Sequence, residues 1–214
     1  MKFEGCSMLR SVVVTVLLSV SLCVPAAEKT ILILGDSLSA AYGMNAQAGW
    51  VSLLRARMNR AGYHYEIINA SVSGDTTHGA HTRLDAILKE IRPDITIVEL
   101  GGNDGLRGIS LGEIRTNLSA IVEKLAAVDS RILLVEMLLP PNYGGAYIEK
   151  FVGIYKTLGV QDNVTLGRML PDTIAEDPTL MQDDGIHPTA AAQPLMLELL
   201  WPYLHPLLDQ NNNS

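Results

Sequence analysis

The sequence contains almost no cysteine. Cys6 and Cys23 are the two cysteines in 214 residues, and both lie before residue 28. Beyond that point the chain has no thiol for a disulfide, for nucleophilic attack or for metal binding. Without covalent cross-links it must depend on a hydrophobic core for stability, and its length is sufficient for one sizeable core.

Runs of basic residues are also absent, and the formal net charge is −7. This charge argues against nucleic acid as a partner and provides no attraction to anionic lipid. Hydrophobic residues make up 48% of the chain and charged residues 18%, which is typical of a globular protein rather than a disordered one.

An apolar run extends from Val12 to Val24 and is too short for a comfortable membrane span. Basic residues precede it and small residues follow it, which is the pattern of a secretory signal peptide. We therefore expect residues 1–27 to be a signal peptide that is cleaved after Ala26 or Ala27. The mature protein is expected to be periplasmic or secreted, with no stable membrane insertion.

Two alternatives stay open for this segment. Cys23 would be the modified residue of a lipoprotein, although Leu22 before it is not the small residue that such processing prefers. Otherwise the segment would serve as an uncleaved membrane anchor.

In the rest of the chain, β-rich apolar runs alternate with helical patterns. Strands are predicted at residues 31–34, 65–68, 95–100, within 131–139, and at 164–166. Helices are predicted at residues 47–60, 84–91, 114–125, 147–158 and 190–208, the last one interrupted by prolines. This alternation, at a spacing of about 25–30 residues, predicts βαβ units and a parallel sheet with helices on both faces.

We therefore predict one α/β domain over residues 28–209 and a disordered polar tail at 210–214. The expected architecture has three layers, α/β/α, around a five-stranded parallel sheet with strand order 2-1-3-4-5. Residues 160–180 carry little readable pattern.

A candidate site begins where the first strand ends, at Gly35-Asp36-Ser37. In an open parallel sheet, ligands bind at the carboxyl edge, in the crevice where the strand order reverses. Strands 1 and 3 flank that point in the predicted order. Ser37 and Asn103 follow these two strands, so we expect them to meet although they are 66 positions apart.

Asp184 and His187 stand in a predicted turn before the last helix. Serine acylation needs a base for the hydroxyl proton, and a histidine base needs an acceptor that fixes its tautomer. Asp184 is close enough in sequence to be that acceptor; Asp183 competes with it, and the spacing favours Asp184. Gly74, in the loop after the second strand, offers an unobstructed backbone N–H to an oxyanion.

Each of these features has a structural explanation when taken alone. Gly-Asp-Ser is a common turn signal, and an aspartate before a helix is a common cap. Four such features in loops after apolar segments, in this order, favour a catalytic interpretation.

Long stretches around these residues resemble the SGNH hydrolases, also called GDSL esterases. The resemblance is strongest to the bacterial group of acyl-CoA thioesterase I, lysophospholipase and arylesterase. It covers about residues 31–197 and is poor across 159–180. The stretches that carry it are residues 35–43, 69–77, 98–108, 139–144 and 181–188.

The resemblance implies roles for individual residues. Ser37 would be the nucleophile, and Asp184 and His187 would complete the triad. The oxyanion hole would combine Ser37, Gly74 and Asn103. Substrate would be contacted by Leu106, Arg107, Gly108, Ile109, Pro140 and Asn142. The resemblance also implies a flavodoxin-like sheet and no cofactor.

No metal is expected, since His78 and His81 lack a third ligand of matching spacing and are expected at the surface. We expect the protein to act as a monomer on a small-molecule acyl ester or thioester.

Three functions remain in competition. The first is an exported serine esterase and thioesterase that cleaves fatty-acyl esters such as lysophospholipids and aryl esters. Acyl-CoA ranks lower as a natural substrate, because it is cytosolic and the signal segment points to export. The second is a carbohydrate O-acetyl esterase, which the apolar Leu106, Ile109 and Leu111 disfavour. The third is a non-catalytic module that binds a lipid or a cell-wall ligand, which the complete triad disfavours.

Overall fold

The structure is a computed structural model and describes residues 29–209. The predicted signal peptide and the predicted tail at 210–214 lie outside the described residues. Within 29–209, none of the helices combines the length and the apolar character needed to cross a membrane.

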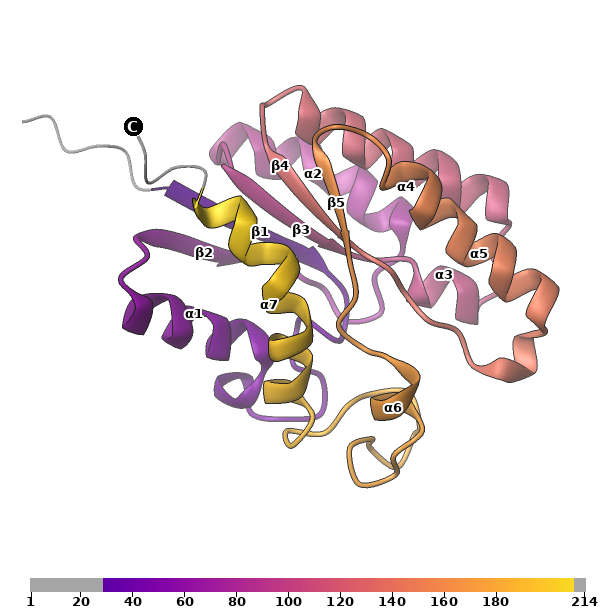
Figure 1. The fold of residues 1–214 in the computed structure, drawn as a ribbon. Coiled ribbons are helices and arrows are strands. Elements are labelled where there is room, and N and C mark those ends of the chain that lie inside the picture. The colour runs from indigo at the N-terminus through magenta and orange to yellow at the C-terminus, as the bar shows by residue number, and fades with distance from the viewer. Residues whose placement is uncertain (1–28, 210–214) are drawn as a thin grey trace, which may run out of the picture.

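Five parallel strands form a sheet in the order β2-β1-β3-β4-β5 (Figure 1). The strands are β1 (Lys29–Gly35), β2 (Tyr65–Asn69), β3 (Ile95–Glu99), β4 (Arg131–Val135) and β5 (Val164–Gly167). This order confirms the predicted doubly wound fold. Gly35 at the end of β1 lies opposite Glu99 at the end of β3, so the loops after these two strands start side by side.

Helices cover both faces of the sheet (Figure 1). One face carries α1 (Trp50–Ala61) and α7 (Gln193–Asp209), and the other carries α2 (Thr77–Glu90), α4 (Leu111–Ala126) and α5 (Gly145–Leu158). Each of α1, α2, α4 and α5 buries an apolar side, as the spacing predicts. The ends carry ordinary signals: Thr76 Oγ1 caps α2, Ser110 Oγ caps α4, and Gly62 at φ +78° ends α1.

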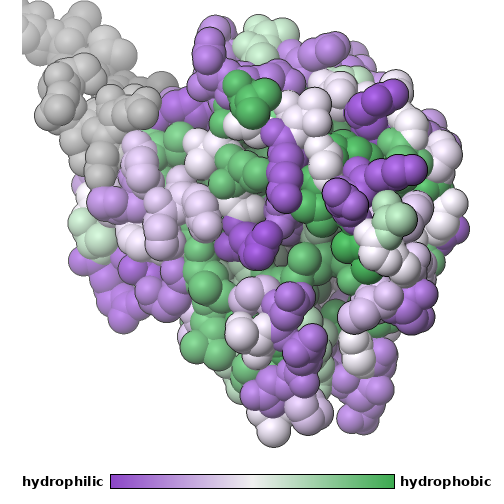
Figure 2. All heavy atoms as spheres, turned by 45° about the vertical axis from the view of Figure 1, so that its right-hand side comes forward, coloured by the Kyte–Doolittle hydropathy of each residue, from purple (hydrophilic) through white to green (hydrophobic). Residues whose placement is uncertain are grey.

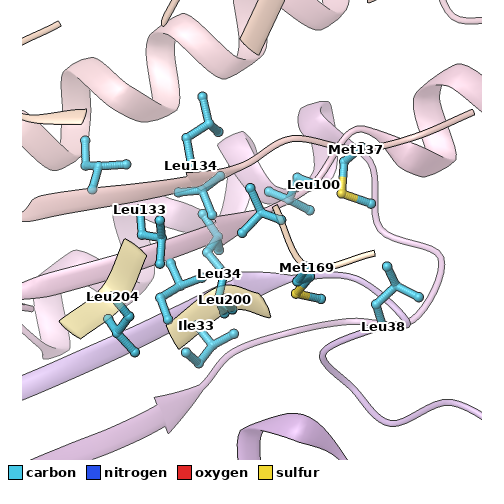
Figure 3. Packing of buried hydrophobic residues seen from close by; sticks show 14 of the residues in the cluster. Ile33, Leu34, Leu38, Leu100, Leu133, Leu134, Met137, Met169, Leu200 and Leu204 are labelled. Atoms are coloured by element: carbon cyan, nitrogen blue, oxygen red, sulfur yellow. The ribbon is translucent and has the colours of Figure 1, made fainter. Parts of the chain in front are cut away.

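The core continues past the strand ends toward the candidate site. Ile33, Leu34, Leu133 and Leu134 are fully buried or nearly so in the sheet centre. Figure 3 shows that the same cluster extends to Leu38, Met137 and Met169, which follow the strands. The floor of the site is therefore continuous with the packed interior, which restricts its movement.

Several short helices were not expected from the sequence. They are η1 (Ala46–Ala48), α3 (Gly102–Leu106), η2 (Pro141–Tyr143) and α6 (Asp172–Ala175). The glycine-rich stretch after β3 indicates a loop, yet Gly101 at φ +107° turns the chain so that α3 begins almost at once. Residue 103, predicted in a loop, therefore lies in a helix.

The last helix begins at Gln193 and runs through Pro202 and Pro206 without a break. Both prolines are exposed, whereas Leu200, Leu204 and Leu208 are buried. A proline in a helix interior costs about 3 kcal/mol, and each fully buried leucine contributes about 1.5–3 kcal/mol. The burial of one apolar side thus outweighs the interruptions that the prolines predict.

Candidate active site

Three loops meet at the carboxyl edge of the sheet. Ser37 follows β1, Asn103 lies in the first turn of α3 after β3, and residues 181–188 form the loop before α7. Ser37 is nearly buried, with 8% of its surface exposed. The loops approach each other because β1 and β3 are neighbours at the point where the strand order reverses.

Ser37, His187 and Asp184 form a continuous chain of hydrogen bonds. His187 Nε2 lies 2.9 Å from Ser37 Oγ, and His187 Nδ1 lies 2.6 Å from Asp184 Oδ2. The carboxylate fixes the ring so that Nδ1 carries a proton and Nε2 is left to accept one from the serine. The structure thus brings together all three residues that the resemblance places in a triad. It is Asp184 rather than Asp183 that contacts the histidine.

Asp184 stays ionised at this position. Burial acts to raise its pKa, but hydrogen bonds from the His187 backbone, the His187 ring and the Ile186 N–H outweigh it and lower the pKa from 3.8 to about 2. Both backbone groups donate to Asp184 Oδ1, at 2.9 Å from Ile186 and 3.0 Å from His187. The anion is therefore available to stabilise an imidazolium at any pH well above 2.

Hydrogen bonds fix the turn of the loop at residues 181–188 and connect it to the loop that contains Ser37. Met181 and Pro188 form an isolated antiparallel bridge, and the Gln182 N–H donates to the His187 carbonyl at 2.7 Å. The Gln182 side-chain amide donates to the carbonyls of Tyr42, at 2.9 Å, and Pro188, at 3.1 Å. The Tyr42 ring stacks at an angle on the imidazole, with ring centroids 4.4 Å apart. Gln182 thus links the loop that carries the histidine to the loop that carries the serine.

Asn103 and Gly74, the other two residues of the expected oxyanion hole, are held by different partners. Asn103 Nδ2 donates to Asp36 Oδ2 at 2.9 Å, which leaves its second N–H available. Gly74 adopts φ +77°, and its carbonyl accepts from Arg107 Nη2 at 3.0 Å. Asp104 accepts from the N–H and the hydroxyl of Thr77, at 2.9 and 2.5 Å, which ties α3 to the start of α2.

Two adjoining cavities open beside these residues. The first has a volume of about 160 Å³ and contains Ser37 and His187 in its wall; the second has a volume of about 280 Å³. Four apolar residues line both cavities: Leu106, Leu138, Leu170 and Ile186. Figure 2 shows hydrophobic surface gathered in the middle of the face that it presents, bordered by hydrophilic side chains. The two cavities share these four residues, so together they form a mainly apolar groove with Ser37 in the wall of its first part.

The predicted substrate residues are placed unevenly along this groove. Leu106 lines both cavities and Pro140 lines the second. Arg107, Gly108, Ile109 and Asn142 are not among the described residues that line the two cavities. Arg107 instead binds the loop of Gly74, and the Ile109 carbonyl accepts from Tyr147 Oη at 3.4 Å.

Sequence reasoning missed much of the groove wall. The additional residues are Val135, Glu136, Met137, Leu138 and Leu139 after or at the end of β4, and Met169, Leu170, Asp172, Ala175 and Glu176 around α6. The position of β4 at the same sheet edge was a usable signal for the first group. The second group lies in the stretch where the sequence showed little pattern.

Comparisons with known proteins identify close relatives. The model of one family, described as "GDSL-like Lipase/Acylhydrolase family", matches residues 33–194. "Esterase TesA" of Pseudomonas aeruginosa is 45% identical over 183 residues, which cover 86% of this chain and 91% of the relative. "Thioesterase 1/protease 1/lysophospholipase L1" of Escherichia coli K12 is 41% identical over 187 residues, covering 87% and 88%.

A solved structure agrees with these relatives. The psychrotrophic esterase EstA from Pseudoalteromonas sp., inhibited by monoethylphosphonate, superposes with a TM-score of 0.80 at 40% identity. The match covers 85% of this chain and 100% of that one.

Proposed function

The chain belongs to the family of GDSL-like lipases and acylhydrolases and is a serine hydrolase that acts on small-molecule esters, and from this premise we propose that it cleaves fatty-acyl esters and thioesters through an acyl-enzyme intermediate. The observation that carries the proposal is the chain Asp184–His187–Ser37 at the mouth of an apolar groove. Lysophospholipids, aryl esters and acyl-CoA thioesters share the required chemistry. Each has an acyl carbonyl, with an apolar acyl chain on one side or a good leaving group on the other.

In the first step Ser37 Oγ attacks the acyl carbonyl carbon. His187 Nε2, 2.9 Å away, takes the hydroxyl proton, and Asp184 stabilises the imidazolium that results. His187 then passes the proton to the alcohol or thiol as the bond to the carbonyl carbon breaks. This leaves the acyl group esterified to Ser37.

Negative charge on the carbonyl oxygen requires donors on the opposite side. The backbone N–H groups of Ser37 and Gly74 and the second N–H of the Asn103 amide supply them. Removal of one such donor typically lowers turnover about 10²–10³-fold.

Water completes the cycle by the same route. His187 removes a proton from the water, hydroxide adds to the acyl carbonyl, and the proton goes back to Ser37 Oγ as the acid is released. The phosphonate-inhibited structure of the relative EstA supports a nucleophile of this kind, because phosphonates react with activated serines.

The groove supports an acyl chain rather than an acetyl group. An acetyl ester needs little space beyond Ser37, whereas the second cavity extends the groove past Leu106 and Leu170 to Pro140 and Ala175. Burying each methylene of an acyl chain there contributes about 0.8 kcal/mol.

Export and a monomeric state belong to the proposal as well. The basic, apolar and small-residue order of residues 1–27 supports a cleaved signal peptide. The N-terminal sequence of the protein recovered from the periplasm or the medium, and its mass in solution, test these two points. An N-terminus at residue 1 would contradict the signal peptide.

Hydrolysis of a series of p-nitrophenyl esters from acetyl to palmitoyl tests the function, with Ser37→Ala measured beside the wild type. We expect a maximum at medium or long chains, absent in the variant. Full activity of Ser37→Ala would contradict the mechanism. A preference confined to acetyl would move the substrate to acetylated carbohydrates, and lack of labelling by a fluorophosphonate would favour a binding module.

A further inference from the structure

A buried acid, Glu99, contacts Asp36, the residue before the proposed nucleophile Ser37. Glu99 ends the central strand β3, opposite Gly35, and none of its surface is exposed. Its neighbour Asp36 is only 2% exposed. Two acids in the packed interior require a physical explanation, because an ionised carboxylate is strongly destabilised when it is removed from water without a partner.

The two oxygens of Glu99 have different surroundings. Oε2 accepts from Ser39 Oγ at 2.7 Å and from the Asp36 N–H at 3.2 Å. Oε1 is fully buried, and no donor among the described residues reaches it. A carboxylate oxygen in that position would be left without compensation, whereas a protonated oxygen would be a donor in search of an acceptor.

Asp36 is the candidate acceptor for a proton on Glu99. The Asp36 N–H donates to Glu99 Oε2 at 3.2 Å, and both side chains are buried, so the two acids occupy the same part of the interior. The other partners of the Asp36 carboxylate are donors: the Leu38 N–H reaches Oδ1 at 3.1 Å, and Asn103 Nδ2 reaches Oδ2 at 2.9 Å. The surroundings of Asp36 therefore favour an ionised carboxylate, and those of Glu99 favour a protonated carboxylic acid.

We propose that Glu99 is a neutral carboxylic acid that donates its proton to the ionised Asp36, and that this pair is the positioning device that orients the Asn103 amide in the oxyanion hole. The pair carries one proton and one negative charge. The kinetic part of this inference rests on the proposed function of Asn103, whereas the location of the proton does not.

The electrostatics of the pair agree with this assignment. Burial raises the pKa of Glu99 well above 4.5, and the negative charge of Asp36 raises it further. Burial also raises the pKa of Asp36, but hydrogen bonds from Leu38, Glu99 and Asn103 and the charge of His187 oppose that effect. When two buried carboxyls share a site, one holds the proton, and here it is Glu99.

Other titratable groups surround the pair. Tyr155, fully buried, donates its hydroxyl to the Leu100 carbonyl at 2.8 Å, and burial raises its pKa well above 10, so it remains neutral. Glu136 is itself paired with Arg168. These neighbours are acids or neutral groups, so they favour a single negative charge over two at the pair.

An ionised Asp36 determines which way the Asn103 amide faces. A carboxylate accepts only, so Nδ2 must face it, and the second N–H of the same nitrogen is held in a fixed direction. A neutral Asp36 would accept the amide less strongly and would allow it to rotate. The proton on Glu99 therefore contributes to catalysis through two successive hydrogen bonds.

Infrared spectroscopy of the folded protein locates the proton. At neutral pH we expect a carboxylic-acid C=O band in the wild type that disappears in Glu99→Gln. Asp104→Asn is the matched control, because Asp104 is equally buried but accepts two hydrogen bonds from Thr77, and the band should survive there. A wild type without the band, or a band that persists in Glu99→Gln, overturns the proposal.

Kinetics on a p-nitrophenyl ester test the positioning role. Glu99→Ala removes the donor, and Asp36→Asn removes the anion; each should lower kcat about 10–100-fold with KM within about twofold. Glu99→Gln keeps a neutral donor of the same shape and should restore kcat to within about threefold of the wild type. A glutamine variant as slow as the alanine variant overturns the proposal.

If Glu99→Ala does not fold, Asp36→Asn and the infrared spectra decide the matter without it. If the wild type cleaves no ester, the proposed function fails, while the infrared band still shows where the proton lies.

Discussion

Carboxyl groups behave in opposite ways on the two sides of the site. At the strand ends, Asp36 and Glu99 are buried at the centre of the sheet and share one proton in our proposal. In the loop before α7, the Asp184 side chain is 40% exposed and fully ionised, with three donors directed at it. The comparison shows that the partners of a carboxyl group, together with its burial, decide whether it orients its neighbour as a neutral donor or as an anion.

The two sides also differ in how they are held. The strand-end side is part of the packed core, so its geometry follows from the fold. The loop side is held by a few hydrogen bonds through Gln182 and by the contact of Tyr42 with His187.

Asp184→Asn should lower kcat about 10⁴-fold, because an amide can direct the wrong histidine tautomer toward Ser37 and cannot stabilise an imidazolium. Steady-state hydrolysis of a p-nitrophenyl ester measures the effect. Asp183→Asn is the matched control, since Asp183 is exposed and does not contact His187, and its kcat should stay within about twofold of the wild type. Equal losses in the two variants would mean that the loop fold, rather than the anion, matters.

Leu170→Trp should obstruct the passage between the two cavities, which Leu170 lines on both sides. We expect kcat/KM for long-chain esters to fall about 10–100-fold, while acetyl esters, which end in the first cavity, change little. Val160→Trp, at a position that is 81% exposed, controls for the bulk of the added ring. A uniform loss across all chain lengths would contradict the idea that the groove holds the chain.

Glu99→Gln should change how stability depends on pH. A carboxyl with a raised pKa binds its proton more tightly in the folded state, so the wild type loses stability as pH rises above 4.5, toward the pKa of folded Glu99. The loss is about 1.4 kcal/mol per pH unit in that range. Urea unfolding at several pH values should show this slope in the wild type and a smaller one in the variant. Parallel slopes would show that Glu99 is ionised in the folded state as well as in the unfolded state.

Gln182→Met removes two side-chain hydrogen bonds, each contributing about 0.5–1.5 kcal/mol, while it keeps the side chain's length. We expect faster amide exchange across residues 181–188 and a loss of kcat of about three- to tenfold. Hydrogen–deuterium exchange read by mass spectrometry measures the first effect. Gln161→Met, at an exposed position before the amino end of β5, is the control. Unchanged exchange in the Gln182 variant would contradict the link between the two loops.

The sheet and the residues at its carboxyl edge could be predicted because simple sequence periodicities determine them. Apolar runs marked the five strands, and the rule for the switch point brought Ser37 and Asn103 to the same edge. The spacing of Asp184 and His187 placed them within one turn and favoured Asp184 without excluding Asp183; in the structure His187 Nδ1 lies 2.6 Å from Asp184 Oδ2. The predicted signal peptide, tail and domain limits remain predictions.

What could not be predicted depended on contacts between distant segments. The glycines before Asn103 concealed α3, and the wall formed by residues 169–176 lies in a stretch without periodicity. The last helix continues through its prolines because Leu200, Leu204 and Leu208 are buried, which the sequence pattern did not show. Glu99 did leave a signal, a single acid inside an apolar strand, but its meaning required the positions of Asp36 and Ser39.

The hydrogen bond between Ser37 and His187 joins residues 150 positions apart, one after the first strand and one before the last helix. No fragment of the growing chain that stops short of residue 187 contains the proposed triad. An incomplete polypeptide can therefore build most of the sheet and still be unable to cleave an ester. Esterase activity is therefore expected only from a chain that extends through residue 187, and its appearance during synthesis or refolding marks the docking of the loop before α7 on the Ser37 loop.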